Sequence, residues 1–237
     1  MPRPRTASNE AILAAAARVI VRHGPAKLTL AAVAEQAGLA PATLVQRFGS
    51  KRGLLLALVR QAESDVRRPF EDAREGRRSP LAALHAALAE LASDVGTPDE
   101  LANHLAFLQM DLTDPEFRRH AAAHAWTMRR EITGLLDDAV AAGELTAEQD
   151  TKSLARSVHV TYNGSLISWA LIGDGSLADA LRADLDQLLR PYRTADTRHC
   201  EETPCSSPDP LRSSREAPAA PGAASPPNWA RPAPPFT

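Results

Sequence analysis

The sequence predicts an all-α protein of about nine helices, and three observations lead to this fold class. Apolar residues recur at intervals of three and four positions through most of residues 8–190. Aromatic residues make up only 4% of the chain, so leucine, alanine and valine must fill the core, which favours helices over strands. Capping residues, prolines and glycines also punctuate the pattern where helices should begin and end.

The first three predicted helices are closely spaced. Each begins at a capping residue or a proline and ends at a glycine, and together they cover residues 8–24, 29–38 and 41–49. The second helix is expected to be closed by a tight turn at Gly38, and Leu44 and Phe48 are the expected buried pair of the third.

The remaining helices are longer and form the body. Ser50 caps a fourth helix with a wide leucine stripe, which Pro69 should end or kink. Later starts are marked by cap and proline signals, and the box Thr146-x-x-Gln149 is expected to open the penultimate helix. The predicted starts are Ser79, Thr97, Asp114, Thr146 and Ser176.

The charge distribution divides the chain. Residues 1–60 contain nine Lys and Arg residues and two acidic ones, a net charge of +7; the whole chain carries −2, which leaves −9 for the remainder. A basic segment joined to an acidic body indicates that one end meets a polyanion. We expect a DNA-binding domain over residues 1–53, a helical effector-binding and dimerisation domain over 54–192, and a disordered Pro/Ala/Ser-rich tail over 193–237.

Residues 30–48 have the spacing of a helix-turn-helix motif, with a recognition helix at about residues 41–48. In this motif the second helix enters the major groove and the first crosses the DNA backbone. Gln46 can pair with adenine through two hydrogen bonds, and Lys51 can neutralise a phosphate. The predicted DNA-contacting residues are Thr29, Ala42, Thr43, Val45, Gln46, Arg47 and Lys51.

The stretch TLAAVAEQAGLAPATLVQRFGSKRGLLLALV, residues 29–59, resembles the DNA-binding domain of TetR-type repressors. The helix layout extends the similarity over residues 8–190. Two positions depart from the family pattern: Ala40 stands where a serine cap is usual, and Val45 where an aromatic residue is frequent. The matching positions are Thr29, Ala34, Ala37-Gly38, Thr43-Leu44, Phe48 and Ser50-Lys51.

The resemblance implies a homodimeric repressor that binds double-stranded operator DNA and releases it when a small-molecule effector binds the body. It also implies phosphate contacts by Thr29, Thr43, Arg47 and Lys51, and a four-helix bundle formed by the last two helices of both subunits. A band of small residues and a leucine ridge suit that dimer interface, with Ser157, Thr161, Gly164, Ser168, Leu181 and Leu185 as candidates.

The effector pocket has candidate residues among the scattered aromatic, methionine and histidine side chains of the body. Core packing is the default interpretation of any one of them, and lining a pocket is the alternative. The candidates are His104, Phe107, Trp126, Met128, Tyr162 and Trp169.

Two other classes of protein are alternatives: an architectural, ligand-independent DNA-binding dimer and a helical enzyme. No GxSxG, Walker, GxGxxG or HExxH motif occurs, so we predict that the chain is not an enzyme. His104, His120, His124 and His159 form no tight cluster with cysteines or carboxylates at ligand spacing, and Cys200 and Cys205, with His199 beside them, lie in the predicted tail. Neither a metal nor a cofactor is therefore expected.

The expected location is the cytoplasm, without membrane association. The only cysteines are Cys200 and Cys205, both in the predicted tail, as is typical of a reducing compartment. The beginning MPRPRTASNE lacks an apolar signal core, and no run of 18 apolar residues occurs.

Overall fold

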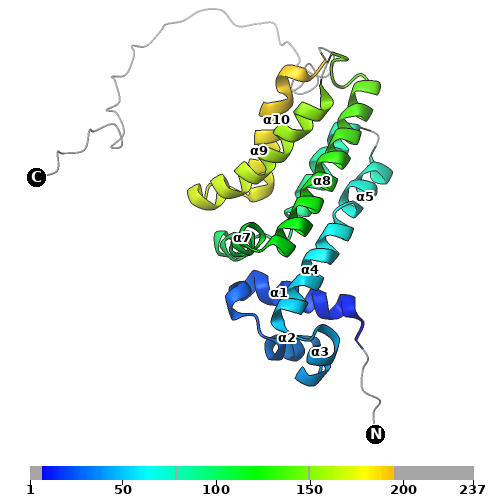
Figure 1. Ribbon diagram of the computed structural model, residues 1–237. Coiled ribbons are helices and arrows are strands. Elements are labelled where there is room, and N and C mark those ends of the chain that lie inside the picture. The colour runs from blue at the N-terminus through cyan, green and yellow to red at the C-terminus, as the bar shows by residue number, and fades with distance from the viewer. Residues whose placement is uncertain (1–6, 78, 149, 195–237) are drawn as a thin grey trace, which may run out of the picture. The chain divides into compact units, whose positions relative to one another are not determined.

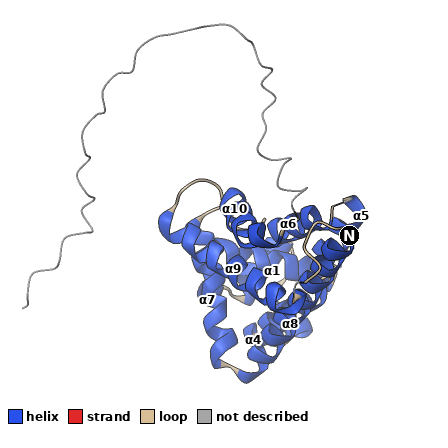
Figure 2. Cartoon of the chain, turned by 90° about the horizontal axis from the view of Figure 1, so that it is seen from above, coloured by secondary structure: helices blue, strands red, loops and turns tan. Residues whose placement is uncertain are grey.

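The computed structural model describes residues 7–77, 79–148 and 150–194, all of which belong to one compact unit. These residues form ten α-helices and one short 3₁₀ helix, and regular structure among them is entirely helical (Figures 1 and 2). The predicted all-α class is confirmed.

The first four helices follow the expected pattern of caps and glycine ends. Gly24 has φ 75° and interrupts α1 before Pro25, and Gly38 closes α2 with φ 67°, a conformation that glycine adopts at no steric cost. Ser8, Thr29 and Ser50 each accept a hydrogen bond from a backbone amide of the helix that follows. The helices are α1 (Asn9–Lys27), α2 (Leu30–Ala37), α3 (Pro41–Phe48) and α4 (Lys51–Asp65).

The body contains six further α-helices. The predicted fourth helix corresponds to α4 together with α5, because Val66 and Arg67 between them keep helical backbone angles and Pro69 lies in the first turn of α5. The body helices are α5 (Arg68–Gly76), α6 (Pro80–Leu91), α7 (Pro98–Thr113), α8 (Pro115–Ala141), α9 (Thr151–Ile172) and α10 (Leu177–Leu189), followed by η1 (Arg190–Tyr192).

The predicted start of the penultimate helix at Thr146 is wrong. Helix α9 begins at Thr151, and the carboxylate of Asp150 caps it by accepting from the amides of Lys152 and Ser153, both at 3.2 Å. The amide of Thr146 instead donates to the carbonyl of Tyr192 at 2.9 Å, which holds this loop against η1.

The predicted tail boundary at residue 193 is also wrong, because the body extends two residues further. Arg193 forms an isolated β-bridge with Leu145, and the amide of Thr194 donates to the carbonyl of Glu144 at 3.2 Å. The rest of the predicted tail, residues 195–237, lies outside the described residues.

Two buried apolar clusters organise the unit. The first is formed by α1–α4 and the loop residue Leu28, and Phe117 of α8 completes it; Phe107 and Met110 of α7 pack against it. The second fills the body, between α5, α6, α8, α9 and α10. The short helices at the N-terminal end therefore share their core with two helices of the body.

Candidate functional site

The turn between α2 and α3 positions one face of α3 outward. Leu44 is the buried residue of α3 and anchors it on the first apolar cluster. On the opposite side Ala42, Val45 and Gln46 are exposed, Val45 by 52%. Ala40 makes no side-chain capping bond, so the start of α3 is favoured by Pro41, whose fixed φ suits the first helical position.

The other predicted DNA-contacting residues have different environments. Thr29 is exposed, and its hydroxyl caps α2 by accepting from the amide of Ala32 at 3.0 Å. Thr43 is half-buried. The first turn of α2 contains no acidic residue, so its backbone amides are compatible with a phosphate.

The two basic candidates bind the protein itself. Arg47 donates to the backbone carbonyl of Ala7 and to Asn9 Oδ1 at 3.3 Å, and Lys51 Nζ donates to the carbonyl of Ala26 at 3.0 Å. Arg47 follows the buried Leu44 by three residues and so lies near the inner side of α3. The prediction that Arg47 points outward with Gln46 is wrong.

Arg52, which the sequence pattern did not single out, connects the N-terminal helices to the body. Its guanidinium contacts Asp114 at 2.9 Å and Glu116 at 2.8 Å and lies over the ring of Phe117. Hydrogen bonds from Arg52 hold the pKa of both carboxyls below their usual range. No spacing pattern could have identified this pairing, because the partners are more than 60 residues apart.

A second connection runs from α7 to α1. Asn103 Nδ2 donates to the backbone carbonyl of Val21 at 2.9 Å. A Cβ atom at Gly24 would come within 2.8 Å of Asn103 Oδ1, so the bend in α1 and the amide of Asn103 fit closely. Phe107, one turn later, meets Phe117 edge to face with 6.3 Å between ring centroids. One side of α7 is thus bound to α1 and to the first apolar cluster.

His104 and Asp111 lie two turns apart on α7, beside the side that carries Asn103 and Phe107. Burial raises the pKa of Asp111 to about 6, and its Oδ1 is buried without a hydrogen-bond partner in the part of the chain that the structure describes. Desolvation lowers the pKa of His104 although the residue is exposed. A side chain that is both crowded and exposed lies at an open edge of the fold.

Three histidines from three helices lie near one another at this edge. The charged form of His124 disfavours charge on both His104 and His159, although desolvation is the larger cause of their lowered pKa values. The pKa of His159 falls to about 4, and its Nδ1 accepts from Arg129 Nε at 3.0 Å. His159 is therefore neutral at pH 7.

The six predicted pocket residues are not gathered in one cavity. Met128, Tyr162 and Trp169 belong to the body core, where burial raises the pKa of Tyr162 above its usual range. Phe107 packs against the first cluster, His104 is exposed, and Trp126 is 68% exposed beneath the guanidinium of Arg129.

The candidate dimer residues separate by helix. On α9, Ser157, Gly164 and Ser168 are exposed and Thr161 is half-buried. The same side of α9 exposes the apolar residues Val160, Ile167 and Leu171, the last by 82%.

The leucine ridge predicted on α10 is not available to a partner. Leu181 and Leu185 are only 2% and 1% exposed and pack in the core of their own subunit. Helix α10 has one stripe of buried leucines, and its own body uses it, so the assignment of these two residues to the interface is wrong.

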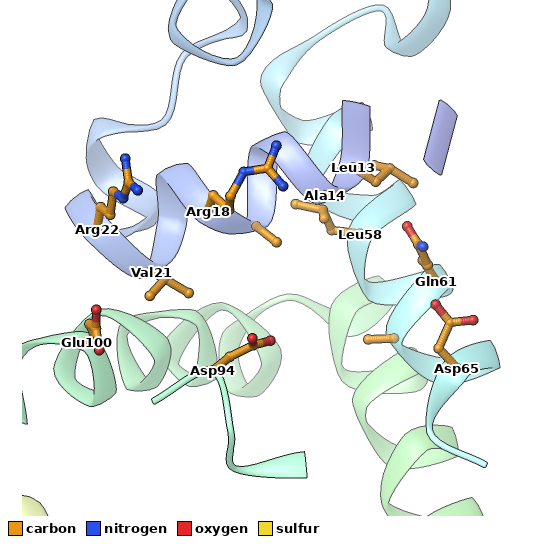
Figure 3. Close-up of a pocket in the computed structure, with 12 residues that line it drawn as sticks. Leu13, Ala14, Arg18, Val21, Arg22, Leu58, Gln61, Asp65, Asp94 and Glu100 are labelled. Atoms are coloured by element: carbon orange, nitrogen blue, oxygen red, sulfur yellow. The ribbon is translucent and has the colours of Figure 1, made fainter. Parts of the chain in front are cut away.

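A cleft of about 530 Å³ lies between α1, α4 and the beginning of α7 (Figure 3). Arg18 and Arg22 lie on its α1 side, Asp94 and Glu100 lie across from them, and Asp65 belongs to α4. None of the predicted effector-binding residues lines it.

Neither a metal site nor a membrane span is found within residues 7–77, 79–148 and 150–194. No three His, Cys, Asp or Glu side chains of these segments are grouped to hold a metal ion. No helix there is both long and apolar enough to cross a bilayer.

Comparisons with known proteins match both the N-terminal helices and the body. Residues 12–58 match the family model described as bacterial regulatory proteins, tetR family, and residues 80–192 match the one described as BetI-type transcriptional repressor, C-terminal. The HTH-type transcriptional regulator BetI of Agrobacterium fabrum (strain C58) is 31% identical over 163 residues, which cover 68% of this chain and 76% of that protein.

Solved structures share the fold. SmeT, the repressor of the Stenotrophomonas maltophilia multidrug efflux pump SmeDEF, aligns with a TM-score of 0.60 at 23% identity, over 87% of this chain and 98% of SmeT. The transcriptional regulator FadR of Bacillus subtilis, in complex with stearoyl-CoA, aligns with a TM-score of 0.57 at 20% identity, over 76% of this chain and 97% of FadR.

Proposed function

Because the chain belongs to the TetR family of bacterial transcriptional regulators, we propose that it is a homodimeric repressor whose helix α3 reads operator DNA. A small molecule that binds the body releases the DNA. The three regions of the chain that we expected from its charge pattern take distinct parts in this proposal: residues 1–53 bind DNA, residues 54–192 bind the effector and the partner subunit, and the segment after them has no assigned part.

The observation that carries the proposal is the exposed face of α3. Ala42, Val45 and Gln46 project from a helix that Leu44 anchors and Gly38 orients. A short side chain such as Ala42 permits close approach to the groove, and Gln46 can bond adenine at two atoms. The amides at the start of α2, with Thr29, and the Lys51 ammonium are the proposed phosphate contacts.

The proposed dimer interface is the exposed face of α9. Small residues at Ser157, Gly164 and Ser168 let a partner helix approach closely, and exposed apolar residues such as Leu171 give that contact its stabilising area. A two-fold operator requires two copies of α3 held at a fixed separation, so a monomer would bind poorly.

The proposed effector site lies where α7, α8 and α9 meet. Its candidate residues are still the six named from the sequence, and they differ in environment: Met128, Tyr162 and Trp169 pack in the body core, Phe107 packs against the first apolar cluster, and His104 and Trp126 are exposed. Helix α7 contacts α1 through Asn103 and carries His104 and Asp111 beside that contact. A ligand that displaces α7 therefore acts directly on α1 and the helices that read DNA.

The proposal is tested with the intergenic DNA next to the chain's own gene, since regulators of this kind frequently control a neighbour. The purified protein should bind this DNA in the presence of excess nonspecific competitor, and Gln46→Ala should weaken that binding. The matched control is Gln109→Ala, which changes an exposed glutamine on α7. Binding of the wild type that competitor DNA abolishes, or equal effects of both variants, would overturn the proposal.

A further inference from the structure

A second cleft, of about 750 Å³, lies at the α6–α10 side of the body, and nothing in the proposed function uses it. It is lined by residues of α6 and α10, by Glu144 from the loop before α9, and by Arg193, which follows η1. Its size is that of a site for a small organic molecule. Ala82, Ala86 and Ala89, one face of α6, form its apolar wall.

One side chain in this cleft lacks the partners that burial requires. His85 exposes only 10% of its side chain, and its Nδ1 has no hydrogen-bond partner among the described residues. Its Nε2 lies 3.1 Å from Asp186 Oδ1, an oxygen that also accepts from Arg193 at 2.8 Å. Buried polar atoms without a partner are rare and frequently mark the place of a bound molecule.

The ring of His85 offers an acceptor to the cleft. Desolvation lowers its pKa, the neighbouring Arg182 and Arg193 add to this effect, and Asp186 opposes it. The imidazole is consequently neutral at pH 7; its N–H belongs on Nε2, beside the Asp186 carboxylate, and the lone pair of Nδ1 is free for a ligand.

Most charged side chains around His85 that form neither an ion pair nor a hydrogen bond with the described residues are positive. Arg77 and Arg182 are exposed and form no ion pair with the described residues, whereas the carboxylate of Glu144 accepts from the amide of Leu81 at 3.0 Å. Asp186 is bound to Arg193, so Glu90 at the rim is the remaining acidic group. Two free guanidinium groups can hold a carboxylate or phosphate through paired hydrogen bonds.

We propose that this cleft binds a small organic anion, with Arg182 and Arg77 on its charged group, His85 on a neighbouring hydroxyl, and the alanines of α6 against its apolar part. The site is separate from the proposed dimer interface. Arg182 and Asp186 face α6, while Asp184, nearly opposite on α10, accepts from Ser165 of α9 at 2.6 Å.

The test follows the imidazole resonances of the full-length protein at pH 7 by NMR, with the His85 signal assigned from its loss in His85→Gln. Salicylate, phenyl phosphate and inorganic phosphate are added separately. Salicylate or phenyl phosphate should shift the His85 signal saturably, and whichever binds more tightly identifies the anionic group. No saturable shift with either, or equal affinity for inorganic phosphate, would overturn the proposal.

Arg182→Ala should weaken that binding about tenfold, because it removes a charge-assisted hydrogen bond. The control, Arg190→Ala, changes an exposed arginine at the end of the same helix that does not line the cleft, and should leave binding unchanged. Unaltered affinity in Arg182→Ala would contradict the assignment. The signal reports on the cleft alone, so its failure leaves the proposed operator binding untouched.

Discussion

At the scale of single residues, three candidate DNA-contacting side chains on α3 and α4 differ sharply in what they are free to do. Gln46 of α3 is exposed and available to a base, whereas Arg47 of α3 is bound to Ala7 and Asn9, and Lys51 of α4 is bound to Ala26. Specificity is therefore assigned to Gln46, and the two basic residues hold α3 and α4 against the two ends of α1 in the free protein.

Gln46→Ala should relax the preference at one base position of the bound DNA by about 1–3 kcal/mol, the value of a two-atom contact with a base. The salt dependence of binding should stay unchanged, because no phosphate contact is lost. Affinities for all single-base variants of the site, measured over a salt series, check this. A uniform loss across all variants would instead assign Gln46 to the backbone.

Lys51→Ala should reduce the salt dependence of DNA binding by about one unit of slope, as expected for one lost phosphate contact. The change requires that Lys51 exchange the carbonyl of Ala26 for a phosphate when DNA binds. Fluorescence anisotropy at several salt concentrations measures the slope. An unchanged slope would mean that Lys51 keeps its bond to α1 in the complex.

Asp111→Asn should make stability less dependent on pH. The pKa of Asp111 is raised to about 6 in the folded protein, so its protonated form contributes stability that is present below pH 4 and is lost as pH rises through about 6. The variant should equal the wild type near pH 4 and exceed it by about 1 kcal/mol at pH 8, after allowance for solvent screening. Urea unfolding at several pH values provides the comparison, and parallel profiles would refute the assignment.

At the scale of elements, α7 links the body to the N-terminal helices. It contacts α1 through Asn103 and the first apolar cluster through Phe107, and it carries the exposed His104 and the half-buried Asp111 beside these contacts. A helix held in this way transmits a displacement from one side to the other.

Asn103→Ala should loosen the end of α1. It removes the bond to the carbonyl of Val21, which is worth about 1 kcal/mol, and should raise amide hydrogen exchange over residues 21–28. The control is Asn163→Ala, whose amide bonds only the carbonyl of His159 within its own helix. Exchange at residues 21–28 that does not respond would show that this contact does not hold α1.

The elements themselves were largely predictable from sequence, because local signals determine them. Caps at Ser8, Thr29 and Ser50 and the turn at Gly38 are short-range chemistry, and they fell where expected. The start of α9 was misplaced because Thr146 forms a long-range bond to Tyr192, which no local pattern reveals.

Pairings between distant elements were the part that sequence could not provide. Arg52 looked like one more basic residue of the DNA-binding segment until the fold placed it on Asp114 and Glu116. Leu181 and Leu185 form an apolar ridge that periodicity cannot assign to the subunit's own core or to a partner. Burial in the fold decides for the core.

At the scale of the whole molecule, the proposed homodimer rests on α9. Gly164→Arg should give a folded, helical monomer with lost DNA affinity, because a Cβ atom there meets open space within its own subunit and the arginine would obstruct only a partner. The control is Gly76→Arg, at the exposed end of α5, where a Cβ atom also meets open space. Sedimentation, circular dichroism and DNA binding are measured on both variants. A folded Gly164→Arg dimer that still binds DNA would place the interface elsewhere.

The central claim is that two copies of this chain read DNA through paired α3 helices. Selection of bound DNA from a random pool, followed by sequencing, tests it most directly. The account predicts one enriched sequence with two-fold symmetry, whose half-sites are about one or more helical turns apart. The same selection with Gln46→Ala should lose the preference at one matching position in each half. Enrichment of no sequence, or of a single site without symmetry, would contradict the account.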